Sequence, residues 1–233
     1  MIPQLDVHCH PASYEDAEVY VHERLKQGIR HLGAAASSPR DWSRIIELSR
    51  RHDEVWGGLG IHPWQASVAS DDELDEALSA LESLVSCHAC VRFIGECGLD
   101  ACRPDMARQK ALFEAQIDIA RRHGLMIVVH CVKAWHEMPR LLKRYDDVLF
   151  HGFSGSVEIQ REVLSRGGFV SLGRAMLRKT PPFLLPELIR RAFLETDDDA
   201  VHPAISLKDV AERIEGFDLE ASESLAIARF TRA

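Results

Sequence analysis

Histidine is the residue type that first suggests chemistry in this sequence. The chain has 12 histidines among 233 residues, and several of them directly follow short apolar segments. His8 and His10 stand two residues apart in QLDVHCHP, so a strand here would place both imidazoles on one face and Cys9 on the other. Two neutral imidazoles at this spacing can bind one cation. The spacing therefore predicts that a metal site begins near residue 8.

Other ionisable residues also follow apolar segments. They are His62, Glu96, His130, His151 and Asp197. A single histidine in such a position is more often a hydrogen-bonded structural residue, so the prediction depends on all of these side chains meeting in the folded chain. Their nitrogen and oxygen atoms suit Zn²⁺, Mn²⁺ or a similar divalent ion, with no need for a thiolate. For Glu96, which has a glycine on each side in IGECG, the alternative is a buried salt bridge.

The number of these ligands predicts two metal ions rather than one. In a two-metal site a water shared between the ions loses a proton near neutral pH, and the ions stabilise the charge that develops on an attacked phosphoryl or carbonyl group. A carboxylate such as Glu96 can bridge the two ions. The ligand set therefore predicts a metal-dependent hydrolase.

Short β-branched segments alternate with helical patterns along the whole chain. The predicted strands cover residues 4–9, 29–36, 55–62, 91–97, 125–131, 147–153, 168–173 and 192–197. The predicted helices cover residues 14–27, 40–52, 71–86, 105–123, 134–144, 156–166, 183–191, 206–215 and 220–231. One unit in about 29 residues is close to the size of a βα repeat. This pattern predicts a single α/β domain over residues 1–233, a (β/α)₈ TIM barrel, with a doubly wound open sheet as the alternative.

The carboxyl ends of the strands carry the active site in a parallel barrel, and six of the eight predicted strands end in one of the residues above. On the face predicted for His8, Asp6 is interpreted either as orienting a ligand or as capping the floor of the barrel. We interpret Asp198 and Asp199 as solvated loop residues. The fold thus predicts that the metal ligands converge on one rim.

At these residues the chain resembles the TatD-related family of metal-dependent deoxyribonucleases and hydrolases, within the wider amidohydrolase-like barrels. The resemblance runs over nearly the whole chain. Its motifs are DVHCHP, GLGIHPW, IGECGLD, a helix with Gln109, Phe113 and Gln116, then VVHC, FHGFSGS and LETD.

The resemblance implies two divalent ions, Zn²⁺, Mn²⁺ or Mg²⁺. The first would be held by His8, His10, Glu96 and Asp197, and the second by Glu96, His130 and His151. Asp197 would also accept the proton of the attacking water, and His62 would face the substrate phosphate. The usual activity of the family is metal-dependent cleavage of DNA, often from the 3′ end of single strands, and DNA is the substrate we expect.

The chain departs from the family pattern on both sides of the expected site. Family members commonly carry an arginine soon after the histidine of the fifth strand, whereas this chain has Lys133, a point charge without the bidentate grip of a guanidinium. After LETD the family often continues with a proline and an aromatic residue, whereas this chain continues with DDAVHP. These departures suggest a divergent subgroup with altered substrate choice.

Two tryptophans are candidates for substrate contact. Trp64 and Trp135 follow predicted rim histidines and are placed to stack on a base, with core or loop packing as the alternative. The alternative activity is hydrolysis of small esters, amides or aminoacyl linkages on nucleic acid in the same barrel. A non-enzymatic metal-binding protein is the least favoured interpretation, because such a protein needs no general base beside its metals.

Composition limits the remaining choices. The net charge of −8 argues against a globally basic nucleic-acid binder, although metal ions can still grip phosphates locally. The chain has neither a phosphate-binding loop nor a GxGxxG motif, so no nucleotide cofactor is expected. Without a readable membrane span or secretory segment, we expect a cytoplasmic protein with no membrane partner. The oligomeric state cannot be derived from the sequence, and a monomer is only slightly favoured.

Overall fold

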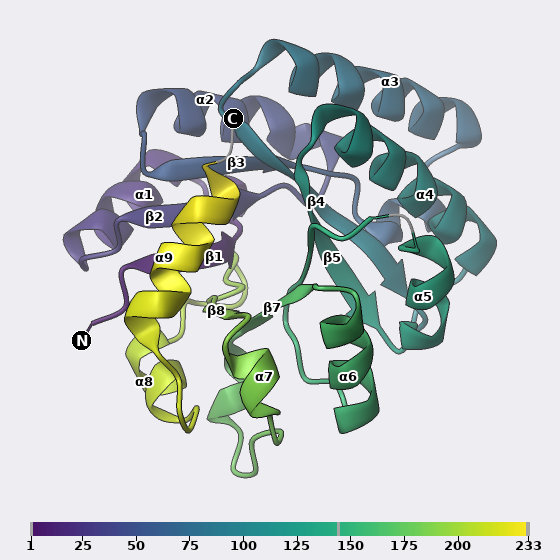
Figure 1. Cartoon of the computed structure of the whole chain (residues 1–233). Coiled ribbons are helices and arrows are strands. Elements are labelled where there is room, and N and C mark those ends of the chain that lie inside the picture. The colour runs from purple at the N-terminus through teal and green to yellow at the C-terminus, as the bar shows by residue number, and fades with distance from the viewer. Residues whose placement is uncertain (1, 144, 232–233) are drawn as a thin grey trace.

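A single eight-stranded parallel sheet forms the centre of the computed structural model, which describes residues 2–143 and 145–231 (Figure 1). Its strands follow one another in chain order, and each neighbouring pair is parallel. They are β1 (Leu5–Cys9), β2 (His31–Ala35), β3 (Val55–Leu59), β4 (Val91–Asp100), β5 (Met126–Val132), β6 (Val148–Phe150), β7 (Phe169–Leu172) and β8 (Ala192–Leu194). The segment after β8 returns to β1, because Asp197 N donates to His8 O at 3.0 Å. The predicted TIM barrel is confirmed, and the open sheet is wrong.

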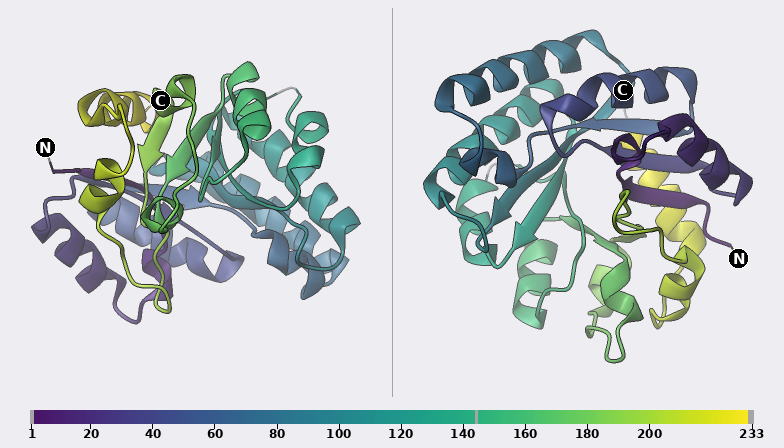
Figure 2. Two further views of the ribbon diagram at one scale, coloured as in Figure 1. Left: turned by 90° about the horizontal axis from the view of Figure 1, so that it is seen from below. Right: turned by 180° about the vertical axis from the view of Figure 1, so that it is seen from behind.

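Helices surround the barrel, as the two further views show (Figure 2). They are α1 (Ala17–Lys26), α2 (Trp42–Arg51), α3 (Asp71–Cys87), α4 (Met106–His123), α5 (Met138–Leu141), α6 (Val157–Ser165), α7 (Pro186–Ile189), α8 (Leu207–Glu212) and α9 (Leu219–Phe230). Short 3₁₀ turns precede several of them: η1 (Pro11–Ser13), η2 (Pro39–Asp41), η3 (Pro63–Ser67), η4 (Trp135–Glu137) and η5 (Arg174–Leu177). The predicted alternation of strands and helices is thus confirmed.

Two predicted helices are much shorter than expected. The segment 134–144 forms η4 and the four residues of α5, and its position 144 lies outside the described residues. The segment 183–191 contains only the four residues of α7. Proline explains both results, since Pro139 and Pro186 lie in the first turns of these helices and cannot continue a helix from the preceding residues.

Strand ends also differ from the prediction. β4 continues to Asp100, because its pairing with β5 extends to Asp100 opposite Val132. β3, β6 and β8 end earlier, at Leu59, Phe150 and Leu194, so His62, His151 and Asp197 lie in the loops that follow rather than on the strands.

The apolar core has two parts. One lies between the barrel and the helices, and the other fills the barrel and receives a side chain from every strand. α9 closes the floor of the barrel, where Phe230 stacks on Trp56 with ring centroids 4.9 Å apart. The packed floor leaves the opposite rim as the place where polar side chains gather.

A β-bulge in β1 determines which way its side chains point. Asp6 pairs with Leu32 and Cys9 with Ala34, so β1 has one residue more than β2 over this stretch. As a result Asp6 and Cys9 both lie on the outer side, where the Asp6 carboxylate accepts from Arg24 of α1 at 2.8 Å. The prediction that Asp6 shares the face of His8 is therefore wrong, and so is its place on the barrel floor. Cys9 does face the helix layer, as predicted.

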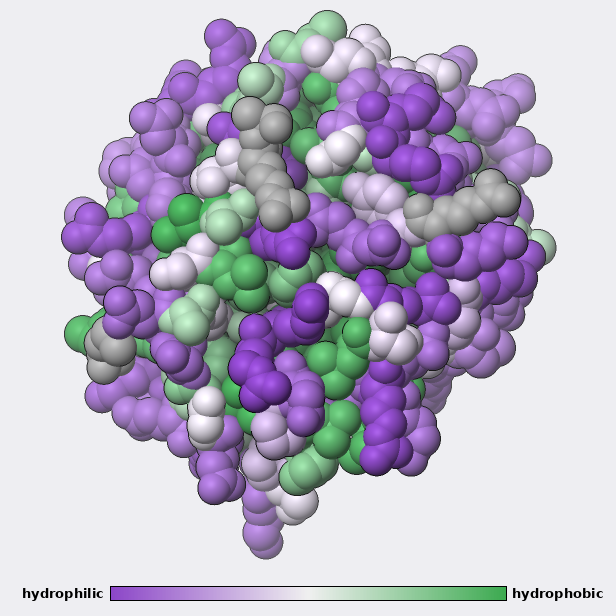
Figure 3. All heavy atoms as spheres, viewed as in Figure 1, coloured by the Kyte–Doolittle hydropathy of each residue, from purple (hydrophilic) through white to green (hydrophobic). Residues whose placement is uncertain are grey.

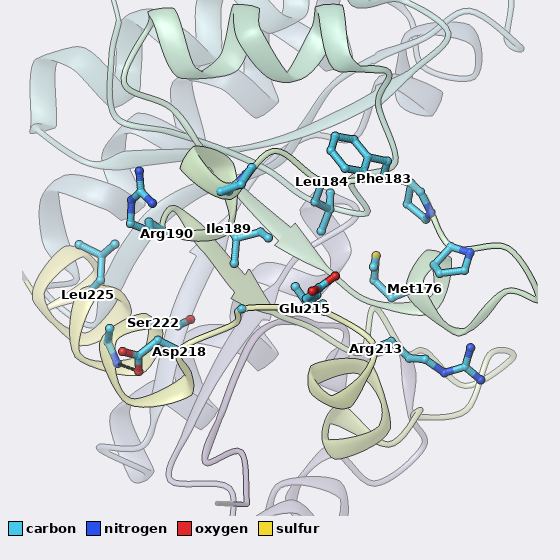
Figure 4. Close-up of a pocket in the computed structure, with 16 residues that line it drawn as sticks. Met176, Phe183, Leu184, Ile189, Arg190, Arg213, Glu215, Asp218, Ser222 and Leu225 are labelled. Atoms are coloured by element: carbon cyan, nitrogen blue, oxygen red, sulfur yellow. Dashed lines mark hydrogen bonds between the residues drawn. The ribbon is translucent and has the colours of Figure 1, made fainter.

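A cavity of about 1070 Å³ lies outside the barrel, beside the short helix α7. Its lining comes from η5 and α7 on one side and from α9 with the loop before it on the other (Figure 4). In the space-filling view this face is mostly hydrophilic, with hydrophobic residues gathered around α7 and beside α9 (Figure 3). None of the predicted metal ligands lines this cavity. Among the described residues, no helix is long and apolar enough to cross a membrane.

Candidate active site

Glu96 lies at the centre of the polar rim. It is buried in the middle of β4, and its two carboxylate oxygens face different groups of histidines. Oε2 lies 3.4 Å from His10 Nε2 and 3.8 Å from His8 Nε2. Oε1 lies 2.8 Å from both His130 Nδ1 and His151 Nε2. The carboxylate therefore stands between two sets of nitrogen ligands, as a bridging group would.

Asp197 completes the first of these sets. Its Oδ1 lies 3.6 Å from His8 Nε2 and 3.4 Å from His10 Nε2. Asp197 has a positive φ of 50°, which is uncommon for a residue with a side chain. The backbone hydrogen bond to His8 O holds this conformation against β1.

Three overlapping clusters of potential metal ligands result. In each cluster one ligand atom per residue lies within 4.8 Å of the others. The clusters are His8, His10 and Asp197; His8, Glu96 and His151; and His62, Glu96 and His130. All six predicted metal ligands are thus brought together. The third cluster also includes His62, whose Nε2 is 3.3 Å from Glu96 Oε1.

The histidine nitrogens are well suited to bind cations. His8 is fully buried, and neither of its ring nitrogens has a hydrogen-bond partner among the described residues. His10 Nδ1 lies 3.0 Å from the carbonyl oxygen of Ala35, which can only accept, so the neutral ring carries its lone pair on Nε2, beside the two carboxylates. A buried imidazole without a partner is costly, and a metal ion removes that cost. The residues present therefore fit a metal site.

Burial and the close contacts between imidazoles and carboxylates set the charges of the site. Burial lowers the pKa of His8 well below its usual value, so this ring is neutral. Burial also disfavours charge on His10 and His151, but the neighbouring carboxylates outweigh it and raise their pKa to about 9 and about 10. Burial raises the pKa of Asp197, whereas His10 and His151 lower it, to about 2 on balance. Without metal, imidazolium rings therefore balance the carboxylates.

The prediction that Asp198 is a solvated loop residue is wrong. Asp198 is completely buried, and its carboxylate accepts hydrogen bonds from Tyr14, Tyr20 and Thr196 at 3.0, 2.9 and 2.7 Å. Its backbone oxygen accepts from His10 N at 2.9 Å. Asp198 thus anchors the loop that presents Asp197. Asp199 accepts from backbone N–H groups of its own turn and is half-buried.

Two glutamines of α4 position other parts of the rim. Gln116 Oε1 accepts from Ile61 N at 2.8 Å and its Nε2 donates to Ile61 O at 3.0 Å, which fixes the backbone beside His62. Gln109 does the same for Asp100, accepting from its N at 2.8 Å and donating to its O at 3.1 Å. Both glutamines are completely buried, so their amides replace strand pairing where the strands end.

The two tryptophans behave differently. Trp64 is 45% exposed beside His62, and its indole N–H donates to Asp100 Oδ2 at 2.8 Å. Arg103 lies over its ring, 4.4 Å from the centroid. Trp135 instead is half-buried and packs on Phe150 and on the buried Phe153, as the core-packing alternative predicts. Lys133 is exposed, with a positive φ of 52°.

A family model described as TatD related DNase matches residues 5–212. The chain belongs to the TatD related DNase family. As a member of the TatD family it is a metal-dependent hydrolase, which the candidate ligand clusters support.

Individual TatD-family relatives are similar at low identity. The uncharacterized metal-dependent hydrolase YjjV of Escherichia coli K12 is 27% identical over 205 residues, which cover 83% of this chain and 78% of the relative. The 3′-5′ ssDNA/RNA exonuclease TatD of Edwardsiella piscicida is 32% identical over 199 residues, 78% of this chain and 73% of the relative. The crystal structure of YjjV has the same fold, with a TM-score of 0.81, full coverage of both chains and 22% identity.

Sequence reasoning missed several residues of this TatD-family site. Asp198, Tyr20 and Asp100 are examples, because each acts through hydrogen bonds between elements distant in the chain. Glu195 is another. It is buried, and its carboxylate accepts hydrogen bonds from Gly152 N and from the Ser171 hydroxyl, both at 2.6 Å. Its position in LETD was the only sign of it in the sequence.

Proposed function

We propose that the protein is a two-metal exonuclease that cleaves single-stranded DNA from the 3′ end. The observation that supports this most is the position of Glu96, whose two oxygens face separate sets of imidazoles. Relatives named 3′-5′ ssDNA/RNA exonuclease in several bacteria support the substrate class.

The proposed ligands are those the rim brings together. His8, His10, Glu96 and Asp197 hold one divalent ion, and Glu96, His130 and His151 hold the other. Zn²⁺, Mn²⁺ and Mg²⁺ are the candidate ions. When bound, such ions supply a water that is deprotonated near neutral pH and positive charge that stabilises the attacked phosphoryl group.

Asp197 is the proposed general base. Its low pKa leaves it ionised at neutral pH, its side chain is 41% exposed, and its φ of 50° turns it toward the rim. Asp197 is therefore available to accept a proton from an attacking water while its backbone stays bonded to β1. Asp198 holds the loop so that this carboxylate keeps its place.

The proposed substrate contacts lie around His62. This imidazole is buried beside Glu96 and orients toward the centre, where it would donate to a phosphate oxygen. Trp64, fixed by Asp100, offers an exposed ring on which a base can stack. Lys133 on the loop after β5 supplies a positive charge for the phosphodiester backbone.

The test is cleavage of an end-labelled single-stranded DNA by metal-stripped protein resupplied with Mg²⁺, Mn²⁺ or Zn²⁺. We expect a ladder that starts at the 3′ end with the wild type and none with Asp197→Asn, which controls for contaminating nuclease. A matching RNA oligonucleotide tests whether the sugar matters. If neither DNA nor RNA is cleaved with any of the three metals, the nuclease proposal is contradicted. Chromogenic esters and amides would then be the substrates to test.

A further inference from the structure

A second group of metal-ligating side chains lies on the outside of the barrel, away from the rim. Glu18 and His22 stand one helical turn apart on α1, and His52 caps the end of α2. One ligand atom from each of the three lies within 4.8 Å of the other two. No residue of this group belongs to the rim clusters.

The hydrogen bonds of this group determine which histidine nitrogens carry a lone pair that can bind a metal ion. His22 Nδ1 lies 2.9 Å from the backbone oxygen of Glu18, which can only accept, so the neutral ring carries its lone pair on Nε2. A hydrogen bond of this type fixes the tautomer and orientation of metal-binding histidines. His52 Nε2 lies 2.7 Å from Glu18 Oε2, and the His22 and His52 rings meet edge to face with centroids 5.4 Å apart. A cation can take the position of the proton between His52 and Glu18.

The positive charge of the neighbouring Arg51 is balanced by a second carboxylate, Glu47. Arg51 binds the other oxygen of Glu18, Oε1, at 3.0 Å and also reaches Glu47 at 2.5 Å. It therefore holds the Glu18 carboxylate in position and leaves Oε2 to the histidines.

We propose that Glu18, His22 and His52 form a separate Zn²⁺ site that links α1 to α2. Two imidazoles and one carboxylate are a donor set that zinc prefers, whereas Mg²⁺ and Ca²⁺ prefer oxygen ligands alone. Water completes the coordination, because these three side chains lie at the surface. The site is independent of the proposed nuclease activity.

Zinc at this place would stabilise the support of the active site. α1 also carries Tyr20 and Arg24, which bond Asp198 and Asp6 behind β1 and β8. Fixing α1 against α2 therefore restrains the helix that holds these two buried carboxylates. The metal acts here as a structural clip and takes no part in the reaction.

The test is the number of Zn²⁺ ions bound by the full chain, measured by calorimetry and by metal analysis after gel filtration. We compare the wild type with His22→Gln/His52→Gln, and with His123→Gln/His136→Gln as a matched control outside the cluster. The wild type and the control should each bind one Zn²⁺ more than His22→Gln/His52→Gln. This difference does not depend on how many ions the rim holds. Equal numbers in all three proteins would overturn the proposal.

A second measurement needs no substitution. Diethyl pyrocarbonate modifies accessible imidazoles, and peptide mass spectrometry locates the modified residues. Added Zn²⁺ should slow modification of His22 and His52 at least tenfold relative to His136, whose side chain is 75% exposed. Equal rates with and without Zn²⁺ would show that the cluster is an ordinary surface ion pair.

Discussion

The carboxylate of Asp198 accepts a hydrogen bond from the phenol of Tyr20 at 2.9 Å, which ties the loop after β8 to α1. Both side chains are buried, and the residue before Asp198 is the proposed general base. The position of that base therefore depends on a helix outside the barrel.

Replacement of Asp198 by alanine should destabilise the protein by about 2 kcal/mol, because the hydroxyls of Tyr14 and the buried Tyr20 lose their acceptor, whereas Thr196 still bonds Asp6. Tyr20→Phe should cost about 1 kcal/mol, since it removes a single hydrogen bond. Urea unfolding measures both. In the folded fraction, Asp198→Ala should lower kcat more than it raises KM. A stability equal to that of the wild type would show that the buried network has no energetic role.

Replacement of Glu96 should have a larger effect on metal content than replacement of Asp197. Glu96→Gln removes the carboxylate that faces both sets of imidazoles, so both ions should be lost. Asp197→Asn removes a ligand from one set only and should retain at least the ion beside His130 and His151. Metal analysis of the purified variants measures this. Equal metal loss in the two variants would contradict the bridging role of Glu96.

Metal binding should release protons. In the metal-free protein the pKa of His10 is about 9 and that of His151 about 10, so both rings are protonated at pH 7. Metal binding requires neutral imidazole, so about two protons should leave, and affinity should rise as the pH increases toward these values. Calorimetry in two buffers with different ionisation heats counts the protons. An affinity that stays constant between pH 6 and pH 9 would rule this out.

Replacement of Trp64 by alanine should raise KM for single-stranded DNA about tenfold and change kcat little, because stacking of one base contributes about 1–3 kcal/mol. Trp135→Phe is the matched control, since Trp135 packs on Phe150 and Phe153. It should lower stability without changing KM. Steady-state kinetics on oligonucleotides of one length decide the matter, and an unchanged KM in Trp64→Ala would refute the stacking role.

Gly98 should not tolerate alanine. Its φ is +137°, and an added Cβ would lie 2.1 Å from the backbone oxygen of His130. We expect Gly98→Ala to cost more than about 3 kcal/mol and to displace His130. Gly216, with a φ of +75° and nothing within 4 Å of an added Cβ, is the control and should cost only about 1 kcal/mol. Thermal unfolding compares the two. Similar losses would mean that backbone conformation, and not the contact with His130, limits position 98.

The barrel and its rim were predictable because both depend on local patterns. Short apolar runs identified all eight strands, and polar residues at their ends identified the six candidate ligands. The expected alternation of side chains along a strand predicted the wrong face for Asp6. The β-bulge responsible depends on the pairing with β2, which cannot be predicted from the sequence of β1 alone. The prediction also placed His62, His151 and Asp197 on strands that end before them.

Buried polar residues in loops were not predictable. Three consecutive aspartates after LET suggest a solvated turn, yet the second is buried because Tyr14 and Tyr20 come from a distant segment to bond it. The packing of Trp135 on Phe150 and Phe153 was not predictable either, since it depends on contacts between distant segments of the chain.

β4 has ten residues and carries two parts of the site. Glu96 lies in its middle and Asp100 at its end, and Asp100 holds the indole of Trp64. Asp100 Oδ2 lies 3.8 Å from His130 Nε2, and the Trp64 ring lies 4.7 Å from that of His62, so the end of this strand keeps the aromatic surface close beside the reacting centre. New substrate preferences would therefore arise more readily in the loops after β5 and β8, where Lys133 and the segment that follows Asp199 are exposed.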